Sequence, residues 1–312
     1  DAACSVKGIT NSEGGSASYG TSEIMLATSN GFSSKYERSG FSISAVALAE
    51  YDGKMERDYD FSSAVHFSDL RPAAEVGASA AHRTLAKLGA KKAKTGAFPV
   101  IYDQRVSSSI SGHIASAING AAIARGTSFL KDRMGEPVTS KGITITDDPL
   151  RPRGAGSSTF DGEGLPRKKR IMIEDGVLNG WLLDLASAKQ LKLNPTGNAS
   201  RGVSSPPSPS TSNWIMSPGA ISREALIADV KEGFLVTELI GSSVSLITGD
   251  YSRGASGFWI ENGVITYAVT EATIAGNLKN MLMAMTAADD LDFSRSNVTP
   301  SLRIDGMTIA GG

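Results

Sequence analysis

Asn-Gly and Asp-Gly pairs set between apolar runs constrain the fold of this chain more than any other feature. Five such pairs interrupt runs rich in β-branched and aromatic residues: Asn30-Gly31, Asp52-Gly53, Asp175-Gly176, Asn262-Gly263 and Asp305-Gly306. These dipeptides favour the tight turns that join antiparallel strands, because glycine and asparagine adopt positive φ angles at little cost. We therefore predict a β-hairpin at each pair and a protein rich in antiparallel sheet.

One helix and one linker divide the chain into two predicted domains. From Pro72 to Leu88, apolar residues recur at helical spacing, and residues 89–96 form a short polar linker that contains glycine and lysine. We place the domain boundary there. Residues 1–96 are then hairpins plus a helix, residues 97–312 form a β-rich domain, and the predicted fold class is α+β.

The composition is that of a globular protein and argues against several function classes. The chain has 312 residues, of which 40% are hydrophobic and 20% charged, which suits a soluble protein of about two domains. A net charge of -1 provides no field that would attract nucleic acid or an anionic membrane surface. The short basic run at 167–170 is interpreted as a solvated loop.

Cysteine usage and hydropathy favour a cytoplasmic location. Cys4 is the single cysteine, so an internal disulfide is excluded. No apolar segment approaches the roughly 18 residues of a membrane span, and the first residues do not resemble a signal peptide. The start at Asp1 without methionine suggests that an N-terminal piece is missing.

Residues suited to conventional catalytic chemistry are sparse. A zinc hydrolase needs three protein ligands and an open position, but the three histidines, His66, His82 and His113, are scattered along the chain. The chain has no Gly-x-Ser-x-Gly elbow and no glycine-rich phosphate loop. An independent serine hydrolase or a nucleotide-dependent enzyme is therefore disfavoured.

Polar segments beside glycines interrupt the β-rich sequence at 125–128, 158–164, 196–202 and 248–259. Such segments let the backbone of another chain approach closely, or they are loops that cap strands. The residues alone do not separate these two interpretations. Residues 202–213 contain too much serine and proline for a helix or a central strand, and are either an ordered active-site loop or a surface excursion.

Several of these blocks resemble a known family. The TldD/PmbA family, and within it the PmbA (TldE) branch, is similar in ITNSEG (9–14), INGAAIARGTSFLKDRMGE (118–136), DDPLRPRG (147–154), FDGEG (160–164), TGNASRG (196–202), SPSTSN (208–213) and the long block 236–263. The likeness covers essentially the whole chain. It implies an N-terminal α/β portion, shortened in this chain, and a C-terminal, mostly antiparallel β, barrel-like domain.

The same resemblance implies that the catalytic residues are absent here. In this family the TldD-type subunit carries zinc on a His-Glu-x-x-x-His helix and adds a cysteine ligand near the C-terminus. Aligning the chain on Arg125-Gly126-Thr127-Ser128 places Ser111, Gly112 and Ser116 at the first His, the Glu and the second His. A serine hydroxyl is a poor zinc ligand and glycine cannot act as a base. The resemblance implies no metal in this chain and a zinc ion in a TldD-type partner.

The resulting hypothesis is a non-catalytic, TldE/PmbA-type subunit of a cytoplasmic zinc peptidase, which pairs with a TldD-type subunit and acts on unfolded or extended peptides. Alone, such a chain would be inactive. Seven polar residues beside glycines are candidates for substrate or partner contact: Arg125, Thr127, Asn198, Arg201, Asp250, Tyr251 and Arg253. One alternative is a homodimeric peptide-binding or regulatory protein of gyrase-modulator type without protease activity. Another is an enzyme with unconventional metal ligands.

Overall fold

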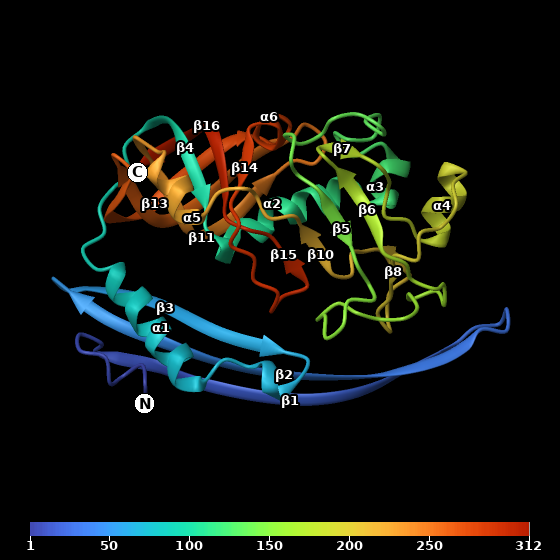
Figure 1. The fold of residues 1–312 in the computed structure, drawn as a ribbon, viewed down its shortest axis with the longest axis horizontal. Coiled ribbons are helices and arrows are strands. Elements are labelled where there is room, and N and C mark those ends of the chain that lie inside the picture. The colour runs from blue at the N-terminus through green and yellow to red at the C-terminus, as the bar shows by residue number, and fades with distance from the viewer. Residues whose placement is uncertain (312) are drawn as a thin grey trace.

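The computed structural model describes residues 1–311, which form two layers (Figure 1). One layer is an antiparallel sheet of β1 (Asn11–Ala27), β2 (Ser33–Tyr51) and β3 (Lys54–Ala64), in the order β1-β2-β3. The predicted turns at Asn30-Gly31 and Asp52-Gly53 are confirmed. In the second, Asp52 and Gly53 have φ angles of 51° and 71°, and the flanking residues of β2 and β3 pair directly.

Helix α1 (Ala73–Ala86) packs across β2 and β3, after a single turn of 3-10 helix, η1 (Phe67–Asp69). It confirms the helix predicted for residues 72–88. Small side chains make the contact, since Ala47 of β2 is buried with Ala80 and Ala81 of α1. Thr84 Oγ1 also donates a hydrogen bond to the Ala47 carbonyl oxygen at 3.2 Å. The alanines let the helix backbone lie close to the sheet.

The second layer is built around a closed barrel. The barrel strands are β4 (Gly96–Tyr102), β11 (Glu232–Val244), β12 (Asp250–Glu261), β13 (Val264–Asn277) and β16 (Leu302–Gly311). They neighbour one another in the order β13-β12-β11-β4-β16, and pairing of β13 with β16 closes the circle. Only β4 and β11 run parallel among these neighbours. The α+β class and the mostly antiparallel, barrel-like domain are thereby confirmed.

Helix α2 (Gln104–Ala117) follows β4 directly and packs against β11. The Asp103 side chain caps its N-terminus by accepting a hydrogen bond from the Arg105 backbone N–H at 3.1 Å. Ile110 and Ile114 of α2 are fully buried in the main core, together with residues of the barrel such as Trp259. The helix is therefore held on one side by the barrel interior.

Shorter elements complete the second layer. A mixed sheet has the order β15-β10-β5-β6-β7, formed by β15 (Asn297–Val298), β10 (Trp214–Met216), β5 (Ile145–Asp147), β6 (Arg170–Glu174) and β7 (Val177–Leu178). The remaining elements are α3 (Gly120–Arg125), α4 (Leu185–Leu191), β8 (Ala199–Ser200), β9 (Ser208–Pro209), α5 (Arg223–Ala228), α6 (Leu278–Met283) and β14 (Met285–Ala287). Across residues 1–311, every helix is too short or too polar to cross a membrane.

Two of the three other predicted hairpins are confirmed, and the third is wrong. Asp175-Gly176 joins β6 to β7, and Asn262-Gly263 joins β12 to β13. Asp305-Gly306 instead lies inside β16, where the pairing with β4 shifts between Ile304 and Met307. Gly306 has a φ angle of 76° at this β-bulge. A bulge needs the same left-handed conformation as a tight turn, so the dipeptide alone does not distinguish them.

Candidate functional site

The three motif positions, Ser111, Gly112 and Ser116, lie on the C-terminal half of α2. Ser111 is fully buried, and its Oγ lies 2.8 Å from Asn297 Oδ1 and 2.7 Å from Thr299 Oγ1. These bonds tie α2 to β15 and to the residues that follow it near the C-terminus. A cluster of hydroxyl and amide groups thus occupies the place where the resemblance puts the first zinc-binding histidine.

The other two motif positions do not converge with Ser111. Ser116 is exposed, and its Oγ donates a hydrogen bond to the Gly112 carbonyl oxygen at 2.9 Å. Residues five apart on an α-helix are separated by about 140° around its axis. Ser111 therefore faces the interior while Ser116 faces solvent. Zinc is held by thiolate, imidazole or carboxylate donors, and two serines and a glycine supply none of these, so these residues do not fit a zinc ion.

The histidines do not supply a substitute. In the part of the chain that the structure describes, no three His, Cys, Asp or Glu side chains are close enough to hold a metal ion. His66 and His82 are exposed, whereas His113 is half-buried on α2. Burial, and then the positive charge of Arg253, lower the pKa of His113 below its usual value of 6.5, so that this imidazole is neutral at pH 7.

Restoring the motif should not restore a metal site. We expect the variant S111H/G112E/S116H to bind no stoichiometric zinc, because it restores two histidines but not the third ligand, the C-terminal cysteine that the resemblance implies, and Cys4 is the single cysteine of the chain. Ser111 is also fully buried, so an imidazole at this position would have to displace neighbouring side chains. Zinc content after dialysis, measured by inductively coupled plasma mass spectrometry beside the wild-type chain, checks this. One zinc ion per chain would show that the missing third ligand is not what prevents zinc binding.

Buried ion pairs join the two layers. Asp58 of β3 accepts hydrogen bonds from the Arg105 guanidinium at 2.8 and 3.2 Å, and Lys87 Nζ, just after α1, lies 3.1 Å from the same carboxylate. Lys87 also pairs with Glu238 of β11 at 2.8 Å. We refer to these four residues as the Asp58 network. The Asp58 side chain is only 4% exposed, so solvent screens its interactions weakly.

The arginine partners decide the charge state of this region. Burial would raise the pKa of Asp58, but hydrogen bonds from Arg105 and its positive charge outweigh burial and hold that pKa below the usual 3.8. Asp60, on the same face of β3, pairs with Arg71 and Arg83 at 2.8 Å each. Its pKa is also lowered, in spite of burial. Both carboxylates are therefore ionised at neutral pH.

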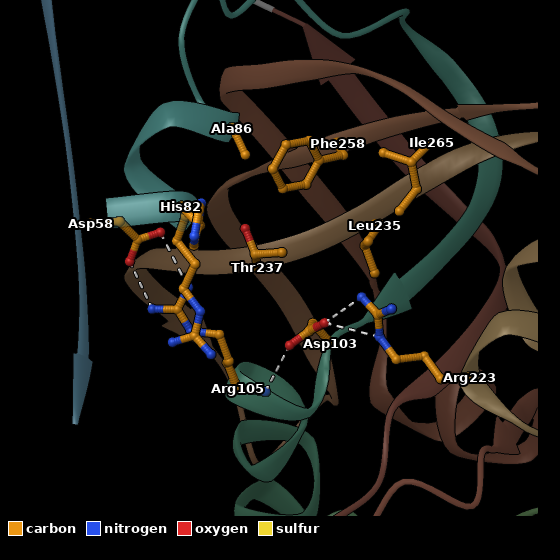
Figure 2. Close-up of a pocket in the computed structure, with 11 residues that line it drawn as sticks. Asp58, His82, Ala86, Asp103, Arg105, Arg223, Leu235, Thr237, Phe258 and Ile265 are labelled. Carbon is orange, nitrogen blue, oxygen red and sulfur yellow. Dashed lines mark hydrogen bonds and ion pairs between the residues drawn. The ribbon is translucent and has the colours of Figure 1, made fainter. Parts of the chain in front are cut away.

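A pocket of about 480 Å³ opens beside the Asp58 network (Figure 2). Figure 2 shows Leu235, Phe258 and Ile265 forming an apolar wall. The charged wall holds Asp103, whose carboxylate accepts hydrogen bonds from Arg223 at 2.8 and 3.2 Å, next to the bonded Asp58 and Arg105. Because these charges neutralise one another, the pocket suits an apolar group better than an ion.

Three of the seven candidate contact residues lie on β12, in different environments. Asp250 is exposed and accepts a hydrogen bond from Thr248 Oγ1 at 2.6 Å. Tyr251 is 2% exposed and packs edge-to-face against His113, with 5.9 Å between the ring centroids. Burial raises the pKa of Tyr251. Arg253 lines a second pocket, of about 330 Å³. Of the three, Asp250 and Arg253 are accessible to a ligand.

The other four candidates lie around α3 and the β8–β9 pair. Arg125 is exposed at the last residue of α3, and Thr127 Oγ1 donates a hydrogen bond to a carbonyl oxygen of that helix at 3.3 Å. Arg201 is exposed directly after β8, whereas Asn198 is buried. The Asn119 side chain donates to the carbonyl oxygen of Pro209 in β9 at 2.8 Å. The structure therefore brings these two regions together.

Asn198 helps to hold two polar segments on β5. Its Nδ2 donates to Asp147 Oδ2 at 2.7 Å, while Asp147 Oδ1 accepts from the backbone and the hydroxyl of Ser212 at 2.7 and 2.8 Å. Burial raises the pKa of Asp147, and these hydrogen bonds partly offset the effect. Both interpretations of residues 202–213 hold in part, because 202–206 are exposed while Ser212 is buried and bonded.

A second carboxylate organises the neighbouring loop. Asp161 accepts hydrogen bonds from the backbone N–H groups of Glu163 and Leu165 at 2.9 Å each, and from that of Ala199 at 3.0 Å. It therefore joins the segment 158–164 to the segment that contains Asn198. The sequence interpretation singled out both segments but neither of the two carboxylates. The sequence offered one signal for Asp147 and Asp161 as organising residues, namely an acidic residue directly before or inside a glycine-containing polar segment.

Comparison with known proteins identifies the family to which this chain belongs. Family models described as the PmbA/TldA metallopeptidase central domain and C-terminal domain match residues 1–88 and 95–311. This chain belongs to the PmbA/TldD family. The resemblance inferred from the sequence blocks is confirmed.

Individual PmbA proteins are similar over almost the whole chain. Metalloprotease PmbA of Escherichia coli O157:H7 is 40% identical over 307 residues, which cover 98% of this chain and 66% of that protein. A PmbA homolog of Haemophilus influenzae is 36% identical over 306 residues, which cover 97% and 66%. The chain thus spans about two thirds of the length of these relatives.

Solved structures show the same architecture. A protein of Bacteroides thetaiotaomicron, named as a modulator of DNA gyrase, superposes with a TM-score of 0.90 at 31% identity, over 99% of this chain and 68% of that one. TldE from Thermococcus kodakarensis gives a TM-score of 0.85 at 23% identity, over 95% and 69%. The second comparison supports the fold alone.

Proposed function

We propose that this chain is the non-catalytic, TldE-type subunit of a cytoplasmic zinc peptidase that acts on unfolded or extended peptides together with a TldD-type catalytic subunit. The state of the motif positions carries this proposal. Ser111 is committed to hydrogen bonds with Asn297 and Thr299, and Ser116 points to solvent, on a helix that is otherwise capped and packed. The scaffold of a metallopeptidase family is retained without donors that could hold its metal.

The sheet of β1, β2 and β3 supports a role in contact with another chain. Within residues 1–311, β1 pairs only with β2, and nearly all its residues are exposed, including Tyr19 and Met25. Its outer edge presents unpaired backbone N–H and C=O groups, which can pair with an added strand. Such pairing uses main-chain hydrogen bonds and hence selects extended chains with little regard to their sequence. We also propose that the chain divides into two folding units between α1 and β4.

Purification from the native host tests the proposed pairing. We expect the tagged protein, isolated under mild lysis, to retain a stoichiometric paralogue that carries His-Glu-x-x-x-His, identified by mass spectrometry. The pair should hydrolyse an unfolded peptide in a chelator-sensitive manner, while the chain alone should not. Recovery of the chain only with itself, or with gyrase, would contradict the proposal and favour a homodimeric peptide-binding or regulatory protein.

A further inference from the structure

The pocket of about 330 Å³ lies between α2, β3 and the barrel strands β11 and β12. Its polar groups include Ser108 of α2 and Arg253 of β12, and Val106 and Leu239 form an apolar part of the wall. It adjoins the pocket in Figure 2, and the two share Thr237 and part of the Asp58 network. The volume is at the lower end of the range for small-ligand sites.

Three of the four charged residues in the wall of this pocket are in ion pairs within the described part of the chain, and the fourth, Arg253, is not. Asp58, Arg105 and Glu238 belong to the Asp58 network, in which opposite charges meet at 2.8 to 3.1 Å. Arg253 is the other charged residue of the wall, and within residues 1–311 it takes part in no ion pair. The pocket therefore contains one guanidinium whose charge the protein leaves unneutralised.

Unpartnered polar atoms gather at the same place. Arg253 Nε and Thr237 Oγ1 are buried without a hydrogen-bond partner, and both side chains line the pocket. A third such atom is Nε2 of His113, whose ring packs edge-to-face against Tyr251, and the positive charge of Arg253 lowers the pKa of His113. Buried polar groups in native proteins are nearly always paired with protein, water or ligand. This concentration of unpaired groups indicates a ligand-binding position.

We propose that this pocket binds the carboxylate of an extended peptide, with Arg253 as the ion-pair partner and the hydroxyls of Thr237 and Ser108 as further donors. The proposal rests on the proposed function, which makes peptides the substrate class. The neighbouring Ser109 is not counted as a donor, because its hydroxyl already donates to the Val106 carbonyl oxygen at 2.7 Å. The side chains of Val106 and Leu239 would contact the aliphatic part of the peptide.

The wall favours a carboxylate over a phosphate. One unpaired guanidinium balances one negative charge, and its planar donors match the two oxygens of a carboxylate. A phosphate dianion would meet the carboxylates of Asp58 and Glu238 in the same wall, and like charges repel. The carboxylate could belong to a peptide C-terminus or to an acidic side chain.

Peptide pairs that differ only in charge test this proposal on the wild-type chain. The probes are tetra-alanine with a free C-terminal carboxylate, the same peptide as its amide, and an amide that contains one internal glutamate. We expect calorimetric or chemical-shift titration to show that the free acid binds roughly tenfold or more tightly than the alanine amide. Binding of the glutamate amide would assign the site to side-chain carboxylates, and its failure would assign it to the C-terminus. Equal affinity for all three peptides, or preference for inorganic phosphate, would overturn the proposal.

A matched pair of variants connects the binding to Arg253. R253Q should weaken binding of the free-acid peptide roughly tenfold or more and leave the affinity for the amide peptide unchanged. R133Q removes the same charge from an exposed arginine that pairs with Glu136, and should bind as the wild type does. If R253Q does not fold, the acid and amide comparison on the wild-type chain still decides. The assay needs no TldD-type partner, so a failure of pairing and a failure of carboxylate binding are distinguishable.

Discussion

Replacing Asp58 with alanine should lower the free energy of unfolding by about 3–5 kcal/mol, the cost of removing one partner from a buried ion pair. The Asp58 carboxylate accepts from Arg105 at 2.8 Å and lies 3.1 Å from Lys87. Their side chains are 18% and 11% exposed, so neither cation can recover full hydration in the folded state. Urea denaturation followed by circular dichroism measures the loss.

A surface aspartate provides the matched control. Asp305 pairs with Arg303 at 2.8 Å, but its side chain is 51% exposed, and an exposed ion pair contributes at most about 1 kcal/mol. D305A should therefore be far less destabilised than D58A. Equal losses in the two variants would show that burial does not govern the Asp58 network.

Acid should act on the same network. The pKa of Asp58 in the folded chain lies below the usual 3.8, so its ion pairs stabilise the fold above that pH and lose their contribution as pH falls through the folded-state pKa. Wild-type stability should thus decline below about pH 4, and D58A should lack this part of the decline. A decline of equal size in both proteins would assign the acid sensitivity to other carboxylates.

Local signals predicted much of the fold. Four of the five Asn-Gly and Asp-Gly pairs form hairpins, and the helical spacing at 72–88 corresponds to α1. The closure of the barrel follows from no local pattern, because β13 pairs with β16 and β11 pairs in parallel with β4 across long stretches of sequence. The resemblance predicted a barrel-like domain, and the pairing of particular strands came from the structure.

The face of a strand was harder to assign than its existence. In β3, Asp58 and Asp60 alternate with Tyr59 and Phe61, a pattern whose apolar side would ordinarily face the core. The structure has the opposite arrangement, with both aspartates buried and Tyr59 42% exposed. The reason lies in distant cations: Arg105 follows 47 residues after Asp58 in the chain. The alternation of polar and apolar residues predicts that a strand has two different faces, but it does not predict which residues pack against each face.

Replacing Asp147 with alanine should have the second large effect, a loss of about 3 kcal/mol in the free energy of unfolding. This carboxylate is 1% exposed and accepts hydrogen bonds from Asn198 Nδ2 and from the Ser212 N–H and hydroxyl. Alanine would leave these buried donors with fewer partners, and water has little access to them. Hydrogen exchange should rise in residues 196–213, the two segments that the carboxylate joins.

The next residue supplies the comparison that isolates this effect. Asp148 carries the same charge, is only partly buried and lies 3.6 Å from Lys169 on the surface. D148A should lower the free energy of unfolding by at most about 1 kcal/mol and leave hydrogen exchange in 196–213 unchanged.

Because burial raises the pKa of Asp147, its protonated form is favoured in the fold, and this contribution to stability is lost as pH rises through the folded-state pKa. D147A should therefore remove a pH dependence that D148A retains, and an identical pH profile in the two variants would show that Asp147 is not the titrating group.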